Sequence, residues 1–233
     1  MITQQSLSYI ALHDGARYDS FYQNTDNSIV INDLRTSVES VEHKQILLWG
    51  AEKSGKSHLL QASCYSAFEH QMLTAYFPLV TLQQYGVRIF AGIKQYRLIC
   101  IDEIDVVLGK PQWEEALFHL INQARENNQI LYFAMKTNPR QVHCKLPDLQ
   151  SRLLWGTNYE LKELPDKEKA LALKSRAKQR GFELSNSVID YIYKRYPRDF
   201  STLMKILDKI DKESLSKKRR VTIPFVKEAL ART

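Results

Sequence analysis

Short apolar runs alternate with amphipathic stretches over roughly the first two thirds of the chain. The runs at 46–49, 75–79, 97–103, 130–135 and 158–161 predict five strands. The third run is apolar at its centre and ends in two carboxylates, which is typical of a strand buried on both faces of a parallel sheet. Pro78 indicates an edge position for the second strand, because proline cannot donate to a neighbouring strand. The pattern therefore predicts an α/β domain with a parallel sheet.

Helical periodicity fills the intervals between these strands. In 111–127 the apolar residues recur on one helical face, so they are expected to pack in the core. A stretch rich in Asn and Asp at 24–32 reads as a loop, and 81–93 is a weakly patterned helix and turn. Further helices are predicted from Asp33 or Thr36 to Glu42, from the loop after residue 50 to about Leu73, and over 147–153.

The alternation of strand and helix stops at about residue 165. Helices are predicted at 166–180, 185–196 and 198–215, and a last one opens at Thr222 with Pro224. We therefore expect a polar leader over 1–25, an α/β domain over 26–164 and a small helical domain over 165–233.

The composition restricts the class of protein and the kinds of partner that the chain can have. With 233 residues, 44% of them hydrophobic and 25% charged, the chain is expected to fold as a soluble protein, and its formal charge of +7 favours anionic partners. Cys64, Cys100 and Cys144 match no metal-binding pattern. No segment approaches the length of about 18 apolar residues that a membrane span requires, and the N-terminus does not resemble a secretion signal. The sequence thus predicts a cytoplasmic protein without a membrane partner.

The strongest chemical signal is Gly50-Ala51-Glu52-Lys53-Ser54-Gly55-Lys56-Ser57, a G-x-x-x-x-G-K-S motif between a predicted strand and a predicted helix. In such a loop the glycines let successive N–H groups turn toward phosphate oxygens, above the positive end of the helix dipole. Lys56 is expected to reach the β- and γ-phosphates, and the Ser57 hydroxyl to bind Mg²⁺. The predicted nucleotide contacts from this segment are Gly50, Lys53, Ser54, Gly55, Lys56, Ser57 and His58.

Asp102 and Glu103 form the second chemical group. They follow a buried strand, where parallel sheets place their ligands. Asp102 is expected to hold Mg²⁺ and to contribute to nucleotide binding, and Glu103 to polarise an attacking water. The alternative is an ordinary acidic turn, but the upstream phosphate loop favours the ATPase interpretation. Thr137 or Asn138, at the tip of the next strand, could contact the γ-phosphate or simply end that strand.

These features together resemble the AAA+ ATPase module and, within it, the DnaA branch that includes regulators of DnaA. The resemblance implies a five-stranded parallel sheet of order 5-1-4-3-2 followed by a helical lid. The more specific segments are Leu48-Trp49, Ser57-His58-Leu59-Leu60, Leu146-Pro147-Asp148-Leu149, Ser151-Arg152-Leu153, Trp155-Gly156, Arg180-Gly181-Phe182-Glu183-Leu184 and Thr222-Ile223-Pro224-Phe225-Val226-Lys227-Glu228.

The resemblance also implies roles for two arginines. Arg152 matches the arginine finger that points at a neighbouring protomer's nucleotide, which makes it a catalytic candidate together with Glu103. Arg198 matches the sensor 2 arginine that reaches from the lid to the phosphates. Without the resemblance, both would read as ordinary surface residues. Lys136 stands near the position where the branch has an acidic sensor 1, so this chain departs from the family there.

The leader acquires an interpretation from the same resemblance. Gln4, Leu7 and Tyr9 are similar to the short peptide with which many bacterial proteins bind the DNA polymerase sliding clamp. The clamp would bring the protein to DNA indirectly. The basic run 217–220 reads either as a solvated loop or as a DNA contact, and DnaA's own helix-turn-helix domain has no counterpart before Thr233.

The predicted function is regulatory. Bound to ADP or ATP with Mg²⁺ and docked on the clamp, the protein would stimulate hydrolysis of DnaA-bound ATP and so prevent re-initiation of replication. Self-association into a homo-oligomer stays open. The rival is an autonomous DNA-dependent ATPase or a helicase loader, and a third interpretation is an adaptor that binds DnaA without changing its nucleotide.

Overall fold

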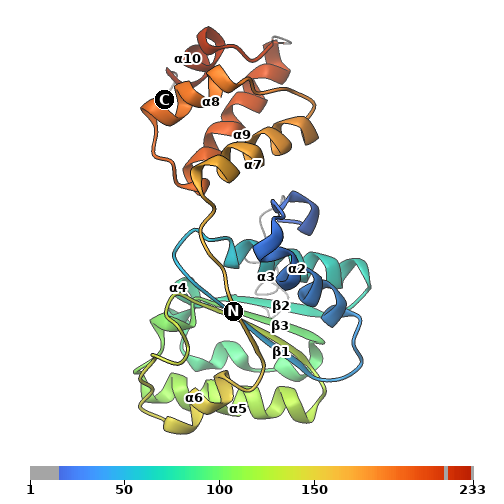
Figure 1. The fold of residues 1–233 in the computed structure, drawn as a ribbon. Helices are drawn as coiled ribbons and strands as arrows, with labels where there is room; N and C mark the ends of the chain where they lie inside the picture. Colours follow the sequence, from blue (N-terminus) through green and yellow to red (C-terminus); the bar gives the residue numbers. More distant parts are fainter. Residues whose placement is uncertain (1–15, 218–219, 232–233) are drawn as a thin grey trace. The chain divides into compact units, whose positions relative to one another are not determined.

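The computed structural model describes residues 16–217 and 220–231 of the 233-residue chain. The described residues fall into two compact units, one ending at Lys162 and the other beginning at Glu163. In the first unit a sheet of five parallel strands lies between two layers of helices (Figure 1).

The sheet has the order β2-β3-β4-β1-β5, so the predicted order 5-1-4-3-2 is confirmed. Every neighbouring pair is parallel, and β2 lies at one edge, as Pro78 indicated. The strands are β1 (Lys44–Trp49), β2 (Thr74–Pro78), β3 (Leu98–Asp102), β4 (Ile130–Met135) and β5 (Thr157–Glu160).

Two hydrophobic clusters fill the space on the two faces of the sheet. Successive strand residues point to opposite faces, so Ile46 and Leu48 join one cluster while Leu47 joins the other. Helices α2 (Thr25–Val38) and α3 (Lys56–Glu69) cover the first face, and α5 (Pro111–Glu126) and α6 (Pro147–Leu153) cover the second (Figure 1). The three central strands are almost fully buried, which explains their continuous apolar runs.

The prediction of a loop at 24–32 is wrong, because α2 begins at Thr25 and ends at Val38. Asn24 Oδ1 accepts a hydrogen bond from Asn27 N, and Asn27 Oδ1 accepts one from Asn24 N, both at 2.9 Å. The Asn and Asp residues therefore cap a helix instead of forming a loop. This helix buries Val30, Ile31, Leu34 and Val38 against the sheet.

Other boundaries differ less from the predictions. Helix α3 ends at Glu69, before the predicted Leu73, because the chain turns through Gln71 in the left-handed conformation. The weakly patterned stretch 81–93 consists mostly of short turns. These are α4 (Leu79–Leu82) and the 3-10 turns η2 (Gln83–Tyr85), η3 (Val87–Phe90) and η4 (Ile93–Gln95), while η1 (Tyr18–Ser20) and η5 (Ile104–Val106) lie elsewhere in the same unit.

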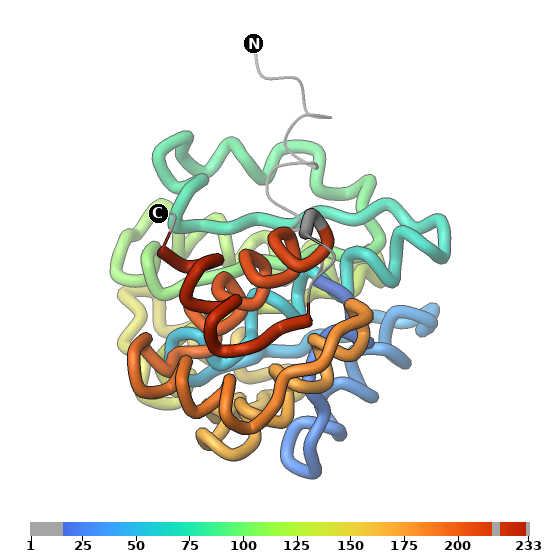
Figure 2. The backbone as a smooth tube through the Cα atoms, turned by 90° about the horizontal axis from the view of Figure 1, so that it is seen from above, coloured from blue at the N-terminus to red at the C-terminus, as the bar shows by residue number. Residues whose placement is uncertain are grey.

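The second unit is helical, as predicted. Its described residues form four helices, orange to red in Figure 2, which pack around a hydrophobic cluster that includes Leu207, Ile210 and Phe225. The Ser185 hydroxyl accepts a hydrogen bond from Val188 N at 3.3 Å and so caps the second of them. The helices are α7 (Asp166–Gln179), α8 (Asn186–Arg195), α9 (Phe200–Lys217) and α10 (Ile223–Ala231).

Candidate nucleotide-binding site

The phosphate loop connects the carboxyl end of β1 to the first turn of α3. Gly50 and Gly55 have φ angles of 143° and 101°, which side chains rarely allow. A Cβ on Gly50 would lie 2.3 Å from Leu161 O, and one on Gly55 would lie 2.5 Å from Phe21 Cε2. Gly55 has no side chain to cap α3, so the first N–H groups of this helix can bind a phosphate.

Lys56 is the charged centre of the loop. Its side chain is buried, and Nζ donates to Gly50 O at 2.8 Å and to Ala51 O at 2.6 Å. Burial lowers the pKa of this ammonium, while the negative charges of Asp102 and Asp105 oppose the change. A phosphate would replace these neutral carbonyl acceptors with charged ones, which form stronger hydrogen bonds with an ammonium.

Asp102 lies at the carboxyl end of β3 and is almost inaccessible, with 1% exposure. The Tyr76 hydroxyl donates to Oδ2 at 2.6 Å and accepts a hydrogen bond from Gln61 Nε2 at 3.2 Å. Oδ1 is buried and has no hydrogen-bond partner among the described residues. The carboxylate thus keeps one oxygen available for a cation.

These residues fit a bound Mg²⁺. Asp102 supplies an unsatisfied carboxylate oxygen, and Ser57 supplies a half-buried hydroxyl in the first turn of α3. Within the described part of the chain, no cluster of three His, Cys, Asp or Glu residues could hold a metal ion by itself. The site therefore suits a cation that is shared with the phosphates of a nucleotide.

We predict that Tyr76→Phe lowers the free energy of unfolding by about 1–3 kcal/mol, because the change leaves Asp102 Oδ2 without its donor in a buried site. Urea denaturation at neutral pH measures the effect. Tyr159→Phe is the matched control, since its hydroxyl also donates to a carboxylate, Asp33 Oδ2 at 3.0 Å, but in a half-buried position. Equal effects of the two changes would contradict the buried role assigned to Tyr76.

Glu103 has an uncommon backbone conformation directly after Asp102. Its φ and ψ angles of 58° and 46° lie in the left-handed region. Such conformations are costly outside glycine and cluster at functional sites. Burial and the neighbouring charge of Asp102 raise the pKa of Glu103, and Lys136 partly opposes this. A carboxylate with a raised pKa is suited to accept a proton from water.

The end of β4 is hydrogen-bonded to the acidic turn that follows β3, through contacts that the sequence did not predict. Asp105 Oδ2 accepts from Lys136 N at 2.7 Å, and Asp105 Oδ1 accepts from Thr137 N at 3.2 Å. The Lys136 ammonium forms an ion pair with Glu52 of the phosphate loop. Lys136, the departure from the family pattern, therefore contacts the loop directly, whereas roles for Thr137 and Asn138 toward a phosphate stay predictions.

The segment before α2 also packs on the loop helix, although the sequence analysis assigned it to the leader. Tyr18 is buried, and its hydroxyl lies 2.7 Å from Ser63 Oγ of α3. The Phe21 and His58 rings have their centroids 5.4 Å apart. His58 thus packs against this segment, and its contact with a nucleotide stays a prediction.

The two predicted arginines belong to different units of the chain. Arg152, at the end of α6, places its guanidinium carbon 3.6 Å from the centroid of the Trp155 ring and 5.3 Å from that of Phe118. Arg198 belongs to the helical unit, where it donates to Asp166 Oδ2 at 2.7 Å. Finger and sensor roles for them stay predictions.

Some predicted residues are not described by the structure. Gln4, Leu7 and Tyr9 lie outside the described residues, and so does the centre of the basic run, Lys218 and Arg219. In the described ranges 16–217 and 220–231, no helix has the length and apolar character of a membrane span.

Comparison with known proteins relates both units to replication proteins. A family model described as the bacterial DnaA ATPase domain matches residues 12–160, and one described as the lid domain of Hda matches 166–230. An uncharacterized protein of Haemophilus influenzae is 35% identical over 218 residues, which are 93% of this chain and 94% of that protein.

Solved structures agree with this comparison at the level of the fold. Domain III of the Thermotoga maritima replication initiation protein DnaA has a TM-score of 0.75 at 16% identity, covering 95% of this chain and 98% of its own. AMPPCP-bound DnaA from Aquifex aeolicus has a TM-score of 0.69 at 19% identity, covering 94% of this chain and 80% of its own.

Proposed function

We propose that this chain stimulates hydrolysis of DnaA-bound ATP. It belongs to the bacterial DnaA ATPase family and carries the lid domain of Hda, which makes it a DnaA-related regulator of replication. In this proposal the protein holds its own adenine nucleotide, docks on the DNA polymerase sliding clamp and acts on DnaA in trans. Its effect is to prevent re-initiation.

The observation that carries the proposal is the separation of Arg152 from its own phosphate loop. Gln45 Nε2 donates to Arg152 O at 2.8 Å, so Arg152 lies beside the beginning of β1. Gly50 follows five residues later, about 16 Å along an extended strand. An arginine side chain does not span that distance, which supports a role of Arg152 toward a nucleotide held by another molecule.

The remaining site residues serve the protein's own nucleotide. Lys56 and the N–H groups of the loop would bind the phosphates of ADP or ATP, and Arg198 would contact them from the lid. Asp102 and Ser57 would hold Mg²⁺, which would neutralise phosphate charge when bound. The bound nucleotide would thereby act as a structural ligand that keeps the protein in the form that binds DnaA.

A second candidate function is supported by Glu103. Its raised pKa and its place beside Asp102 suit an autonomous ATPase, acting as a DNA-dependent motor or a helicase loader. Steady-state ATP hydrolysis by the protein alone, with and without single-stranded DNA, separates the two functions. Strong turnover stimulated by DNA would favour the autonomous ATPase over the regulator.

The main test is a reconstituted assay with radiolabelled DnaA-ATP, this protein and clamp loaded on DNA. We expect conversion to DnaA-ADP only when all components are present. Binding to DnaA without any change in its nucleotide would instead indicate an adaptor.

We predict that Tyr9→Ala weakens clamp binding about tenfold, because an aromatic anchor of such a peptide supplies a large part of its binding energy. Surface plasmon resonance with immobilised clamp measures the affinity. Gln5→Ala is the matched control, since Gln5 lies between the positions of the pattern. Nucleotide affinity is expected to stay unchanged in both variants. Wild-type clamp affinity of Tyr9→Ala would place the docking site elsewhere.

A further inference from the structure

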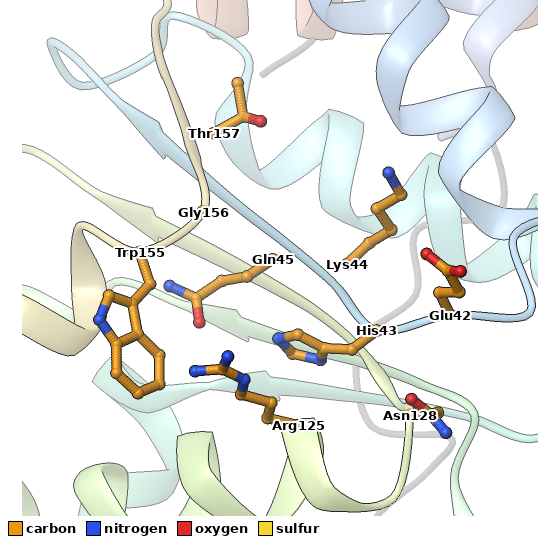
Figure 3. A pocket seen from close by; sticks show the side chains of 9 residues that line it. All are labelled: Glu42, His43, Lys44, Gln45, Arg125, Asn128, Trp155, Gly156 and Thr157. Atoms are coloured by element: carbon orange, nitrogen blue, oxygen red, sulfur yellow. The ribbon is translucent and has the colours of Figure 1, made fainter.

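A polar pocket lies at the amino ends of β1 and β5 (Figure 3). Its lining comes from the beginning of β1 and the residues before it, from the end of α5 and the turn after it, and from the turn that leads into β5: Glu42, His43, Lys44, Gln45, Arg125, Asn128, Trp155, Gly156 and Thr157. The phosphate loop follows the opposite, carboxyl end of β1. The pocket is therefore separate from the nucleotide-binding site, and we call it the Gln45–Arg125 pocket.

The pocket offers a cation that is held in place but not neutralised. The guanidinium carbon of Arg125 lies 4.6 Å from the centroid of the Trp155 ring. Among the ion pairs of the described residues, none includes Arg125. Stacking on an indole orders a guanidinium and leaves its N–H edge for an anion. Lys44 adds an exposed positive charge to the lining, and Glu42 adds an exposed negative one.

The pocket also contains a hydrogen-bond acceptor, the side-chain oxygen of Gln45. Gln45 is 6% exposed, and its Nε2 donates to Arg152 O at 2.8 Å and to Leu153 O at 3.3 Å, which defines the orientation of the amide. Oε1 then has no hydrogen-bond partner among the described residues. Figure 3 shows this oxygen directed toward the Arg125 side of the pocket. A buried acceptor of this kind is satisfied when a ligand supplies an N–H group.

His43 adds no positive charge to the pocket at neutral pH. Its Nδ1 lies 2.6 Å from Gln129 O, so this nitrogen carries the proton in the neutral ring. Burial lowers the pKa of His43, and the charges of Arg125 and Arg97 lower it further, against the effect of the Gln129 carbonyl. Lys44 and Glu42 carry opposite charges, so the net positive charge of the pocket comes from Arg125.

An acidic residue in an extended peptide supplies both complementary groups, because its carboxylate can bind Arg125 while a backbone N–H binds Gln45 Oε1. We propose that the Gln45–Arg125 pocket docks an acidic residue of the protein partner whose nucleotide Arg152 serves. Gln45 and Trp155 contact Arg152 as well as lining the pocket, so a partner seated there lies next to that arginine. This inference rests on the proposed function and adds to it a binding site for DnaA.

The test measures binding and hydrolysis separately. Binding of full-length DnaA-ATP to the immobilised protein is expected to weaken about tenfold with Arg125→Glu, since reversing a charge at an interface leaves like charges opposed. In the hydrolysis assay, the same variant should need about tenfold more protein for half-maximal stimulation while reaching the wild-type maximal rate. Arg88→Glu, an exposed arginine on η3, is the matched control and should change neither value.

Each outcome decides the inference. If Arg125→Glu behaves like Arg88→Glu while the wild type stimulates hydrolysis, the pocket is not the docking site although the proposed function stands. If Arg125→Glu weakens binding but the wild type never stimulates hydrolysis, the pocket stands and the proposed function fails. Loss of affinity for a single-stranded oligonucleotide, with DnaA binding unchanged, would overturn the inference in favour of a nucleic-acid site.

Discussion

Arg152→Ala is expected to lose nearly all stimulation of DnaA-ATP hydrolysis while keeping its affinity for ADP and for the clamp. A guanidinium is planar and permanently charged, and it can stabilise the charge that develops during γ-phosphoryl transfer. Arginine fingers supplied in trans accelerate such reactions by roughly 10³–10⁵, or about 4–7 kcal/mol of barrier. The measurement is the rate of DnaA-ATP hydrolysis on clamp-loaded DNA.

Two further variants make this prediction specific. Arg152→Lys should restore little activity, because an ammonium lacks the forked geometry of the guanidinium. Arg140→Ala, which removes an exposed arginine of the same unit, should behave like the wild type. Full stimulation by Arg152→Ala would show that Arg152 only packs on Trp155 and Phe118, and the trans mechanism proposed here would be wrong.

Lys56→Ala is expected to weaken binding of ADP and ATP by at least tenfold, measured by calorimetry. The change removes a charge-assisted contact with phosphate that contributes about 1.5–3 kcal/mol. In the protein the Lys56 ammonium already lies inside the loop, bonded to the carbonyls of Gly50 and Ala51. Little rearrangement is needed before it contacts a phosphate.

The control for this variant is Lys94→Ala, which removes an exposed lysine on η4 and should leave both affinities unchanged. Circular dichroism must show that Lys56→Ala is folded, because Lys56 is buried and its loss alters the packing of the loop. A folded Lys56→Ala variant with wild-type affinity would contradict the assignment of the loop as the phosphate-binding site.

Periodicity was sufficient to predict the sheet because its strands are buried on both faces. The central runs at 98–102 and 130–135 contain almost no polar residue, so they could be predicted as strands without knowledge of the neighbouring side chains. The first part of helix α2 was predicted as a loop because Asn and Asp favour both loops and helix caps. Only the reciprocal bonds between Asn24 and Asn27 distinguish the two cases, and they require the folded backbone.

The candidate site likewise contains features that the sequence predicts and features that require the folded structure. A phosphate loop is local, since its residues are consecutive and the chain geometry alone brings them together, so Gly50 to Ser57 could be predicted from the sequence. The donor from Tyr76 to Asp102 and the ion pair of Lys136 with Glu52 join residues 26 and 84 positions apart. Their spacing in the sequence does not show that these residues are neighbours unless the order of the strands in the sheet is known.

By itself the sequence determined the parallel α/β fold, the phosphate loop, the acidic end of β3 and the helical second unit, because each depends on neighbouring residues or on a regular period. The tertiary structure alone decided which oxygen of Asp102 stays unsatisfied, and it alone brought Arg125, Gln45 and Trp155 together beside Arg152. The first feature arises where β3, β2 and α3 meet, and the second where β1, α5 and the turn before β5 meet. Contacts between segments so distant in the chain depend on the packing of the whole unit.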